Sequence, residues 1–133
     1  MCLPHNEITM KKRALVVDDS RTAALALAQM LDLLGFSVTI ASGSREAVQK
    51  LLDGGVPDVV FLDVNMPGLS GLEVCSYIRR EPATANVPIV VVSSESQPEQ
   101  VASAMEAGAT AFIPKPATME ALEETLRSIN HSD

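Results

Sequence analysis

Acidic, hydroxyl and amine side chains follow short apolar runs of the sequence. They are Asp18 and Asp19, Asp63, Ser93 and Lys115. If they shared one pocket, the carboxylates and the single ammonium would leave a charge of about −2, which is unfavourable without protons or a cation. Mg²⁺ would relieve it, because this ion is commonly held by carboxylates together with waters and phosphate oxygens. The residue types therefore predict magnesium-assisted phosphoryl chemistry, with Asp63 as nucleophile and with Ser93 and Lys115 binding phosphoryl oxygens.

Short runs rich in β-branched residues alternate with helical patterns along the chain. The runs are Ala14–Val17, Phe36–Ala41, Asp58–Leu62, Pro88–Val92 and Ala111–Ile113. The first, third and fourth are continuously apolar, as expected for parallel strands buried on both faces. This alternation predicts an α/β fold, a flavodoxin-like (βα)5 doubly wound parallel five-stranded sheet with strand order 2-1-3-4-5.

Helices are predicted between and after these runs from capping residues, glycines, prolines and apolar spacing. Their expected first residues or caps are Ser20, Ser44, Gly71, Pro98 and Thr118. The side chains expected to face the sheet are Leu27, Met30, Leu31 and Leu34; Ala47, Val48, Leu51 and Leu52; Val74 and Ile78; Val101 and Met105; and Met119, Leu122, Leu126 and Ile129.

The predicted sheet brings the chemistry-bearing residues to one edge, because the carboxyl ends of parallel strands meet there. Adjacent strands lie about 4.8 Å apart, so Asp19 and Asp63 would reach a common ion, with Ser93 one strand further along. Lys115 would lie roughly 10 Å from Asp63 at the backbone, and its long side chain could cover most of that distance.

Length and charge limit the classes of protein to consider. The chain has 133 residues and a formal net charge of −7, with 47% hydrophobic and 3% aromatic residues. We expect a polar N-terminal arm over residues 1–12 and one domain over residues 13–130; translation could start at Met1 or Met10.

A nucleic-acid partner is not expected, since the chain is acidic and poor in aromatic residues. No apolar stretch suits a membrane span or a signal peptide, which favours a cytoplasmic location. Cys2 and Cys75 are expected to be free thiols.

Sequence motifs in a fixed order resemble the receiver domains of two-component response regulators over residues 13–130. The motifs are Val16–Ser20, Phe61–Gly68 with Gly71, Val92–Ser94 and Phe112–Pro116. The resemblance implies that Asp63 is the phosphoacceptor, and that Asp19, Asp63 and the backbone carbonyl of Asn65 bind Mg²⁺. It implies that Asp18 acts through metal-bound water. It also implies that the phosphoryl donor is a phosphohistidine on a sensor histidine kinase or a histidine phosphotransfer protein.

The same resemblance implies a conformational switch at Ser93 and Phe112. The switch would change the surface formed by the helix from Pro98, the strand Ala111–Ile113 and the helix from Thr118. It also implies a cis Lys115–Pro116 bond. Residues similar to those that tune dephosphorylation in the family are Asn65, Ser94 and Glu95. Ala117 stands where an aromatic residue commonly follows the Lys-Pro pair of the family, which predicts looser packing beside Lys115 and Pro116.

The sequence also allows other interpretations of these residues. Asp18 could only cap a helix, and Phe112 could be a core residue that does not switch. A hydrolase of the haloacid-dehalogenase type would need a second acid where Asn65 stands. A flavodoxin-like cofactor carrier would need a phosphate loop free of acids after the first strand.

The expected role is that of a single-domain response regulator, because about 15 residues follow the last strand and encode no effector domain. Such a chain is a signalling phosphoacceptor rather than an enzyme that turns over a substrate, and it catalyses only its own phosphorylation and dephosphorylation. Alternatives are a phosphate sink or relay intermediate in a phosphorelay, or a phosphorylation-independent docking module. The sequence does not name the downstream protein target.

Overall fold

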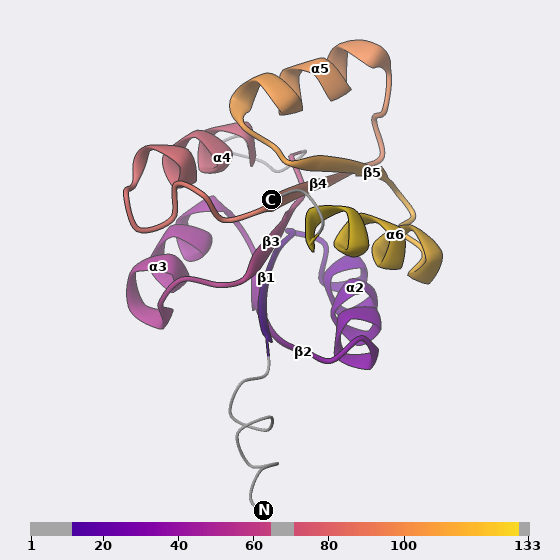
Figure 1. Cartoon of the computed structure of the whole chain (residues 1–133), viewed down its shortest axis with the longest axis horizontal. Coiled ribbons are helices and arrows are strands. Elements are labelled where there is room, and N and C mark those ends of the chain that lie inside the picture. Colours follow the sequence, from indigo (N-terminus) through magenta and orange to yellow (C-terminus); the bar gives the residue numbers. More distant parts are fainter. Residues whose placement is uncertain (1–11, 65–70, 131–133) are drawn as a thin grey trace, which may run out of the picture.

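Strands and helices alternate along the chain (Figure 1), whose computed structural model describes residues 12–64 and 71–130. The elements are β1 (Lys12–Val17), α2 (Arg21–Leu33), β2 (Phe36–Ala41), α3 (Ser44–Gly54), β3 (Val59–Leu62), α4 (Gly71–Arg80), β4 (Ile89–Ser93), α5 (Pro98–Ala107), β5 (Ala111–Pro114) and α6 (Met119–Asn130). Each predicted strand and helix is present, with bounds that agree with the predicted ones to within two residues.

The strands form one parallel sheet in the order β2-β1-β3-β4-β5. This confirms the predicted doubly wound α/β fold. β1 and β3 lie in the interior of the sheet, and Val17 pairs with Leu62 at their carboxyl ends. All four residues of β3 and all five of β4 are buried, which explains the apolar sequences Val59–Leu62 and Ile89–Val92.

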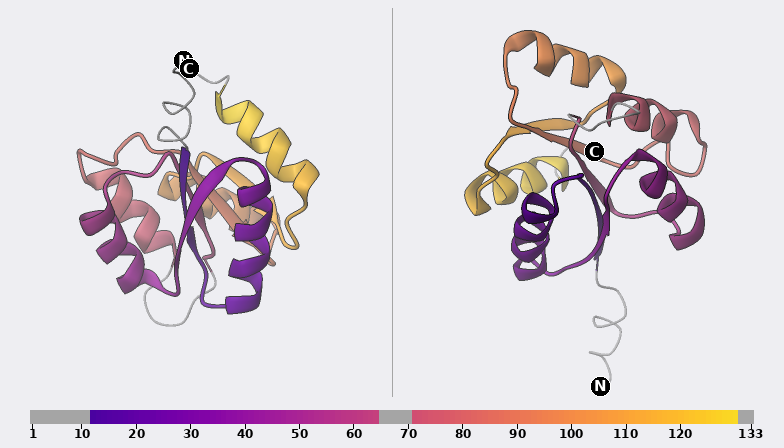
Figure 2. Two further views of the ribbon diagram at one scale, coloured as in Figure 1. Left: turned by 90° about the horizontal axis from the view of Figure 1, so that it is seen from below. Right: turned by 180° about the vertical axis from the view of Figure 1, so that it is seen from behind.

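Helices cover both faces of the sheet: α2 and α6 lie on one face, and α3, α4 and α5 on the other (Figures 1 and 2). Successive residues of a strand point to opposite faces, so β1 divides its side chains between two cores. Ala14 and Val16 pack with Leu27 and Leu31 of α2, whereas Leu15 and Val17 pack with residues of α3 and α4.

The helix termini follow the local signals in the sequence. Ser20 is the N-cap of α2, and its hydroxyl accepts a hydrogen bond from the N–H of Ala23 at 3.3 Å. Gly35 follows α2 with φ of 96°, and Gly108 ends α5 with φ of 115°, a left-handed backbone conformation that favours glycine.

Two side chains expected to face the sheet are instead exposed. Leu52 of α3 is 69% exposed and Met105 of α5 is 44% exposed. In both helices the preceding residue, Leu51 or Ala104, is the buried one. Neighbouring residues on a helix point about 100° apart, so only one of each pair enters the core. Cys75 is buried and free, whereas Cys2 lies outside the described residues. None of the described helices is long and apolar enough to cross a membrane.

Candidate functional site

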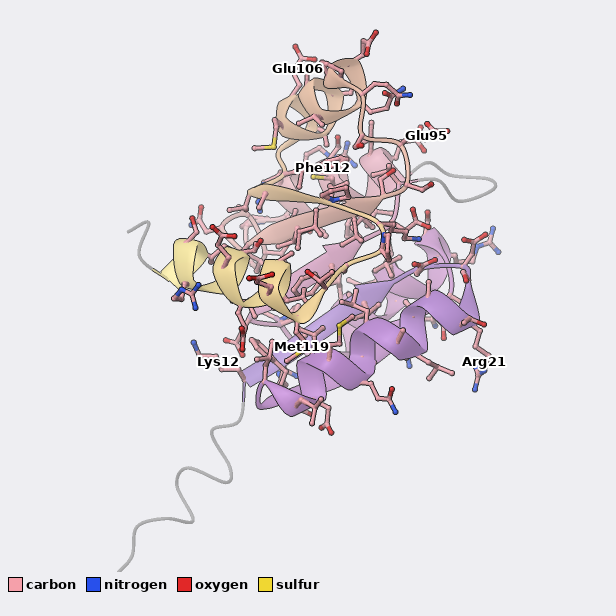
Figure 3. All side chains as sticks on the ribbon, turned by 90° about the vertical axis from the view of Figure 1, so that its right-hand side faces the viewer. Lys12, Arg21, Glu95, Glu106, Phe112 and Met119 are labelled. Atoms are coloured by element: carbon pink, nitrogen blue, oxygen red, sulfur yellow. The ribbon has the colours of Figure 1, made fainter. Side chains whose placement is uncertain are left out.

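The predicted site residues lie at the carboxyl edge of the sheet, where backbone hydrogen bonds to the neighbouring strands hold three of them. Arg21 and Glu95 mark this end of the molecule and Lys12 the opposite end (Figure 3). The backbone N–H groups extend the pairing of the sheet by one residue beyond the strands: Asp18 donates to Ala41 at 3.0 Å, Asp63 to Val17 at 2.9 Å and Lys115 to Ser93 at 2.8 Å. These hydrogen bonds therefore fix the backbone positions of Asp18, Asp63 and Lys115 at the edge of the sheet.

Three carboxylates converge at this edge. Asp18 and Asp63 are each 5% exposed, and Asp19 is exposed to solvent. One carboxylate oxygen from each residue lies within 4.8 Å of those of the other two. Hard oxygen ligands at this spacing, one of them open to water, suit a hydrated divalent cation such as Mg²⁺. Asn65, whose carbonyl is expected to bind the same ion, lies outside the described residues.

Lys115 contacts two of these carboxylates. Its Nζ lies 3.0 Å from Oδ2 of Asp18 and 3.4 Å from Oδ2 of Asp63. Burial alone would lower the pKa of Lys115, but its hydrogen bond to Asp18 and the charges of Asp63 and Asp18 outweigh burial and raise this pKa. The ammonium therefore stays protonated and partly offsets the charge of the acid cluster. The Lys115–Pro116 peptide bond is cis, as expected.

Asp18 takes part in the cluster and is not the cap of α2. Its Oδ1 accepts a hydrogen bond from the N–H of Ser20 at 2.9 Å, while its Oδ2 contacts Lys115. The cap itself is Ser20. One carboxylate thus links the turn before α2 to the lysine that follows β5. The sequence did not indicate that Asp18, rather than Asp63, is the closer partner of Lys115.

Ser93 is fully buried at the end of β4, and the two residues after it are exposed. The Ser93 hydroxyl accepts a hydrogen bond from the N–H of Glu95 at 3.1 Å. The side chains of Ser94 and Glu95 therefore face solvent at the rim of the site.

Gly71 brings the first turn of α4 against the backbone that carries Asp63. A Cβ atom at this position would overlap the carbonyl group of Asp63 and would lie 2.5 Å from Cα of Val64. Real Cβ atoms do not approach other atoms so closely, so any other residue here must displace backbone. In the sequence Gly71 was only part of a motif; its steric role appears in three dimensions.

Phe112 lies half-buried on β5 below α5 (Figure 3). It packs against a small cluster formed by Val91, Ala104 and Ala109, with Val64 and Leu72 at its border. Phe112 therefore packs beside β4, the strand that ends in Ser93, and shares this cluster with Val64, the residue after Asp63.

A cavity of about 110 Å³ lies beside the acid cluster, between α2 and the segment after β5. Asp18 and Lys115 lie at one side of it, and Ala117 is among the apolar residues that line the rest. This cavity corresponds to the looser packing that the alanine at this position predicts.

Arg79 of α4 makes a set of contacts that sequence reasoning missed. Its guanidinium donates to main-chain carbonyls and a hydroxyl on two segments: Ala85 at 3.1 Å and Val87 at 2.7 Å before β4, and Gly108 at 2.9 Å and Oγ1 of Thr110 at 3.2 Å before β5. Arg79 thereby ties the end of α4 to the start of β4 and to the turn between α5 and β5. In sequence it looks like any basic residue in the last turn of a helix.

The fold and this edge define a class of protein: doubly wound α/β proteins that bind charged ligands beyond the carboxyl ends of their strands. The sequence profile of the response regulator receiver domain matches residues 14–127. The chain therefore belongs to the response regulator receiver domain family, whose general role is that of a phosphoacceptor in two-component signalling.

Individual relatives agree with this assignment. The chain is 38% identical over 120 residues to the response regulator MprA of Mycolicibacterium vanbaalenii. The matched region covers 90% of this chain and 51% of that protein. The chain thus spans about half the length of the curated relatives it matches.

Solved structures show the same fold. The chemotaxis protein CheY4 of Vibrio cholerae superposes with a TM-score of 0.83 at 31% identity, covering 90% of this chain and 98% of that one. A response regulator of Thermotoga maritima gives 0.81 at 30% identity, covering 92% and 100%.

Proposed function

We propose that this chain accepts a phosphoryl group on Asp63 from a phosphohistidine, in a reaction that requires Mg²⁺. The observation that carries the proposal is the position of Asp63: buried, within 4.8 Å of two further carboxylates through their oxygens, and 3.4 Å from Nζ of Lys115. The donor would be a sensor histidine kinase or a histidine phosphotransfer protein.

In the proposed reaction a carboxylate oxygen of Asp63 attacks the phosphorus atom of the phosphohistidine. The new O–P bond forms as the P–N bond breaks, and the electron pair remains on the imidazole nitrogen of the donor. Bound Mg²⁺ would neutralise charge on the carboxylates and on the phosphoryl oxygens. Asp18, Asp19, Asp63 and the carbonyl of Asn65 are the proposed ligands, with Asp18 acting through bound water.

Lys115 and Ser93 would bind the transferred group. Lys115 already lies between Asp18 and Asp63, so a phosphoryl oxygen on Asp63 would compete with Asp18 for its ammonium. The Ser93 hydroxyl, which accepts from the N–H of Glu95, would donate its own proton to a second phosphoryl oxygen.

The proposed output is a change in the surface formed by α5, β5 and α6. Movement of Ser93 toward the phosphoryl group would give Phe112 room to turn inward. Phe112 is among the residues that line a groove of about 370 Å³ between β5 and α6. A separate protein that recognises this groove would be the signalling target. Exposed Ser94 and Glu95, with Asn65, would control access of water to the phosphoryl group and hence its lifetime.

The same chemistry also serves a phosphate sink or a relay intermediate, which would pass the phosphoryl group to water or to a second histidine instead of a target. A phosphorylation-independent docking module would need none of these site residues. Transfer of the phosphoryl group from the phosphorylated chain to a histidine phosphotransfer protein would favour the relay.

Intact mass after incubation with Mg²⁺ and acetyl phosphate tests the phosphoacceptor. We expect one phosphoryl adduct on the chain and none on Asp63→Asn. Asp53→Asn, a matched change at an exposed residue near the end of α3, should form the adduct as the unaltered chain does. An adduct of equal yield on Asp63→Asn would refute the assignment, as would the absence of any adduct on the unaltered chain.

Isothermal titration with Mg²⁺ tests the ion site separately. Asp19→Asn should bind the ion at least about ten-fold more weakly, because it loses a charged oxygen ligand. Unchanged affinity would remove Asp19 from the ligand set and leave the phosphoacceptor to be judged by the mass experiment.

A further inference from the structure

The surface between α3 and α4 is hollowed, and it lies on the face of the sheet opposite α2 and α6 (Figures 1 and 2). The groove has a volume of about 500 Å³ and is lined by Val48 of α3 and by Glu73, Val74, Ser76, Tyr77 and Arg80 of α4. Val74 at its floor is buried, while Val48 and Tyr77 are partly exposed. The groove is thus apolar in its centre and open to solvent.

An exposed leucine extends this apolar surface. Leu52 is 69% exposed and stands four residues after Val48, on the same side of α3. A single exposed leucine is common on protein surfaces. Here Leu52 lies one helical turn beyond Val48, which lines the groove together with Tyr77. We call Val48, Leu52 and Tyr77 the apolar strip.

Opposite charges stand at the two ends of the groove. Glu73 and Arg80 are exposed, lie seven residues apart on α4 and are therefore about 10 Å apart along the helix axis. Within residues 12–64 and 71–130 neither side chain is in an ion pair. The dipole of α4 favours these charges at these ends. Their placement on either side of an apolar strip has a further consequence, because such a surface is complementary to itself after a half-turn.

We propose that a second copy of this chain docks on this groove through a two-fold axis. In the dimer, α4 of each copy runs antiparallel to α4 of the other, and the apolar strips of Val48, Leu52 and Tyr77 meet in the centre. Glu73 of each copy faces Arg80 of the partner subunit, so the symmetry produces two ion pairs from one surface.

The size of the surface indicates a weak dimer. α3 and α4 have 11 and 10 residues, so each is about 15 Å long, and two adjacent helices present a face about 20 Å wide. A face of this size is well below the roughly 800 Å² per partner that standard stable interfaces bury. The dimer therefore exchanges with monomer and is populated at high protein concentration.

Sedimentation velocity of the unphosphorylated chain from about 10 µM to about 1 mM tests this proposal over a range suited to weak association. The sedimentation coefficient should rise with concentration. Glu73→Arg and Arg80→Glu should each weaken dimerisation about ten-fold or more, because each turns two attractive contacts into repulsive ones. Glu123→Arg, the same charge change on α6 across the sheet, should dimerise as the unaltered chain does.

Mixing the two single variants provides the decisive comparison. Glu73→Arg carries arginine at both ends of the groove, and Arg80→Glu carries glutamate at both ends. In a mixed dimer every arginine therefore faces a glutamate, so an equimolar mixture should associate more strongly than either variant alone. A misfolded variant could not be rescued in this way.

Tyrosine fluorescence gives an independent readout, because the chain has one tyrosine and no tryptophan. Quenching of Tyr77 emission by acrylamide should decrease as the protein concentration rises. The proposal is overturned if the unaltered chain stays monomeric to about 1 mM, if both single variants associate like the unaltered chain, or if their mixture stays monomeric. None of these outcomes bears on phosphorylation of Asp63.

Discussion

Gly71 is the position where one added methyl group should disturb both stability and the site. Its Cβ would overlap the carbonyl group of Asp63 and lie 2.5 Å from Cα of Val64. These are backbone atoms of the segment that carries the proposed phosphoacceptor, so a side-chain rotation cannot relieve the contact. The backbone of α4 or of the Asp63 segment must move in Gly71→Ala.

Two effects of opposite sign decide the magnitude of this change. Alanine in a helix is favoured over glycine by up to about 1 kcal/mol. Overpacking of a tight site costs about 1–3 kcal/mol and exceeds that gain. We therefore expect Gly71→Ala to lower the free energy of unfolding by about 1–2 kcal/mol.

Gly54→Ala is the matched control for this experiment. Gly54 is the last residue of α3, and a Cβ there meets no other atom within 4 Å. The same substitution should raise the free energy of unfolding by about 0.5 kcal/mol, because the unfolded chain loses flexibility and the helix gains a better former. The two variants should therefore differ by about 2 kcal/mol in opposite directions from the unaltered chain.

Urea unfolding followed by far-ultraviolet circular dichroism measures this difference. With a denaturant slope of about 2 kcal/mol/M, the two midpoints should lie about 1 M apart. Gly71→Ala should also accept phosphoryl groups from acetyl phosphate more slowly, because the displaced backbone carries Asp63. Equal midpoints and equal phosphorylation rates for the two variants would refute the steric argument.

Further predictions concern Lys115, Arg79 and Ala117. The folded-state pKa of Lys115 is raised above its ordinary value of 10.5, so its stabilising effect is complete below that pH and is lost as pH rises through the higher folded value. In urea unfolding without divalent ions, the stability difference between the unaltered chain and Lys115→Met should therefore shrink from pH 9 to pH 12; a constant difference would contradict the pairing with Asp18. Arg79→Met should lower the free energy of unfolding by about 3 kcal/mol, since it leaves partly buried carbonyls without a donor, whereas Arg80→Met should change it by less than about 0.5 kcal/mol. Similar values for the two arginine variants would show that the contacts of Arg79 carry little energy. Ala117→Leu should fill the cavity of about 110 Å³ and raise the thermal midpoint by a few degrees, as about 1 kcal/mol of added burial predicts; a lower midpoint would mean that the cavity cannot accept the side chain.

The order and type of the elements could be predicted because local and global signals agree. β3 is apolar throughout and β4 is apolar up to Val92, and in the sheet both are buried on both faces. The edge of the sheet then determines which residues meet, so Asp18, Asp63 and Lys115 could be placed together from the sequence.

Features that depend on side-chain direction or on close approach could not be predicted in the same way. Leu51 and Leu52 are adjacent residues of the same type, and only the rotation of α3 about its axis, relative to the sheet, decides which of them is buried. The closer pairing of Lys115 with Asp18 depends on distances of a few tenths of an ångström. The contacts of Arg79 depend on where main-chain carbonyls of distant segments point, and residue types do not encode that.

The hydrogen bonds of Arg79 depend on where the main chain runs and little on which side chains it carries. Three of its four hydrogen-bond acceptors are main-chain carbonyls, at Ala85, Val87 and Gly108. Every residue type offers a carbonyl, so a substitution at an intermediate position such as Ala85 leaves the acceptor in place. An insertion or deletion between α4 and β4 would shift Ala85 and Val87 along the chain and leave Nη1 of Arg79 without its two acceptors. Related chains that keep this arginine should therefore vary freely in composition across this connection and very little in its length.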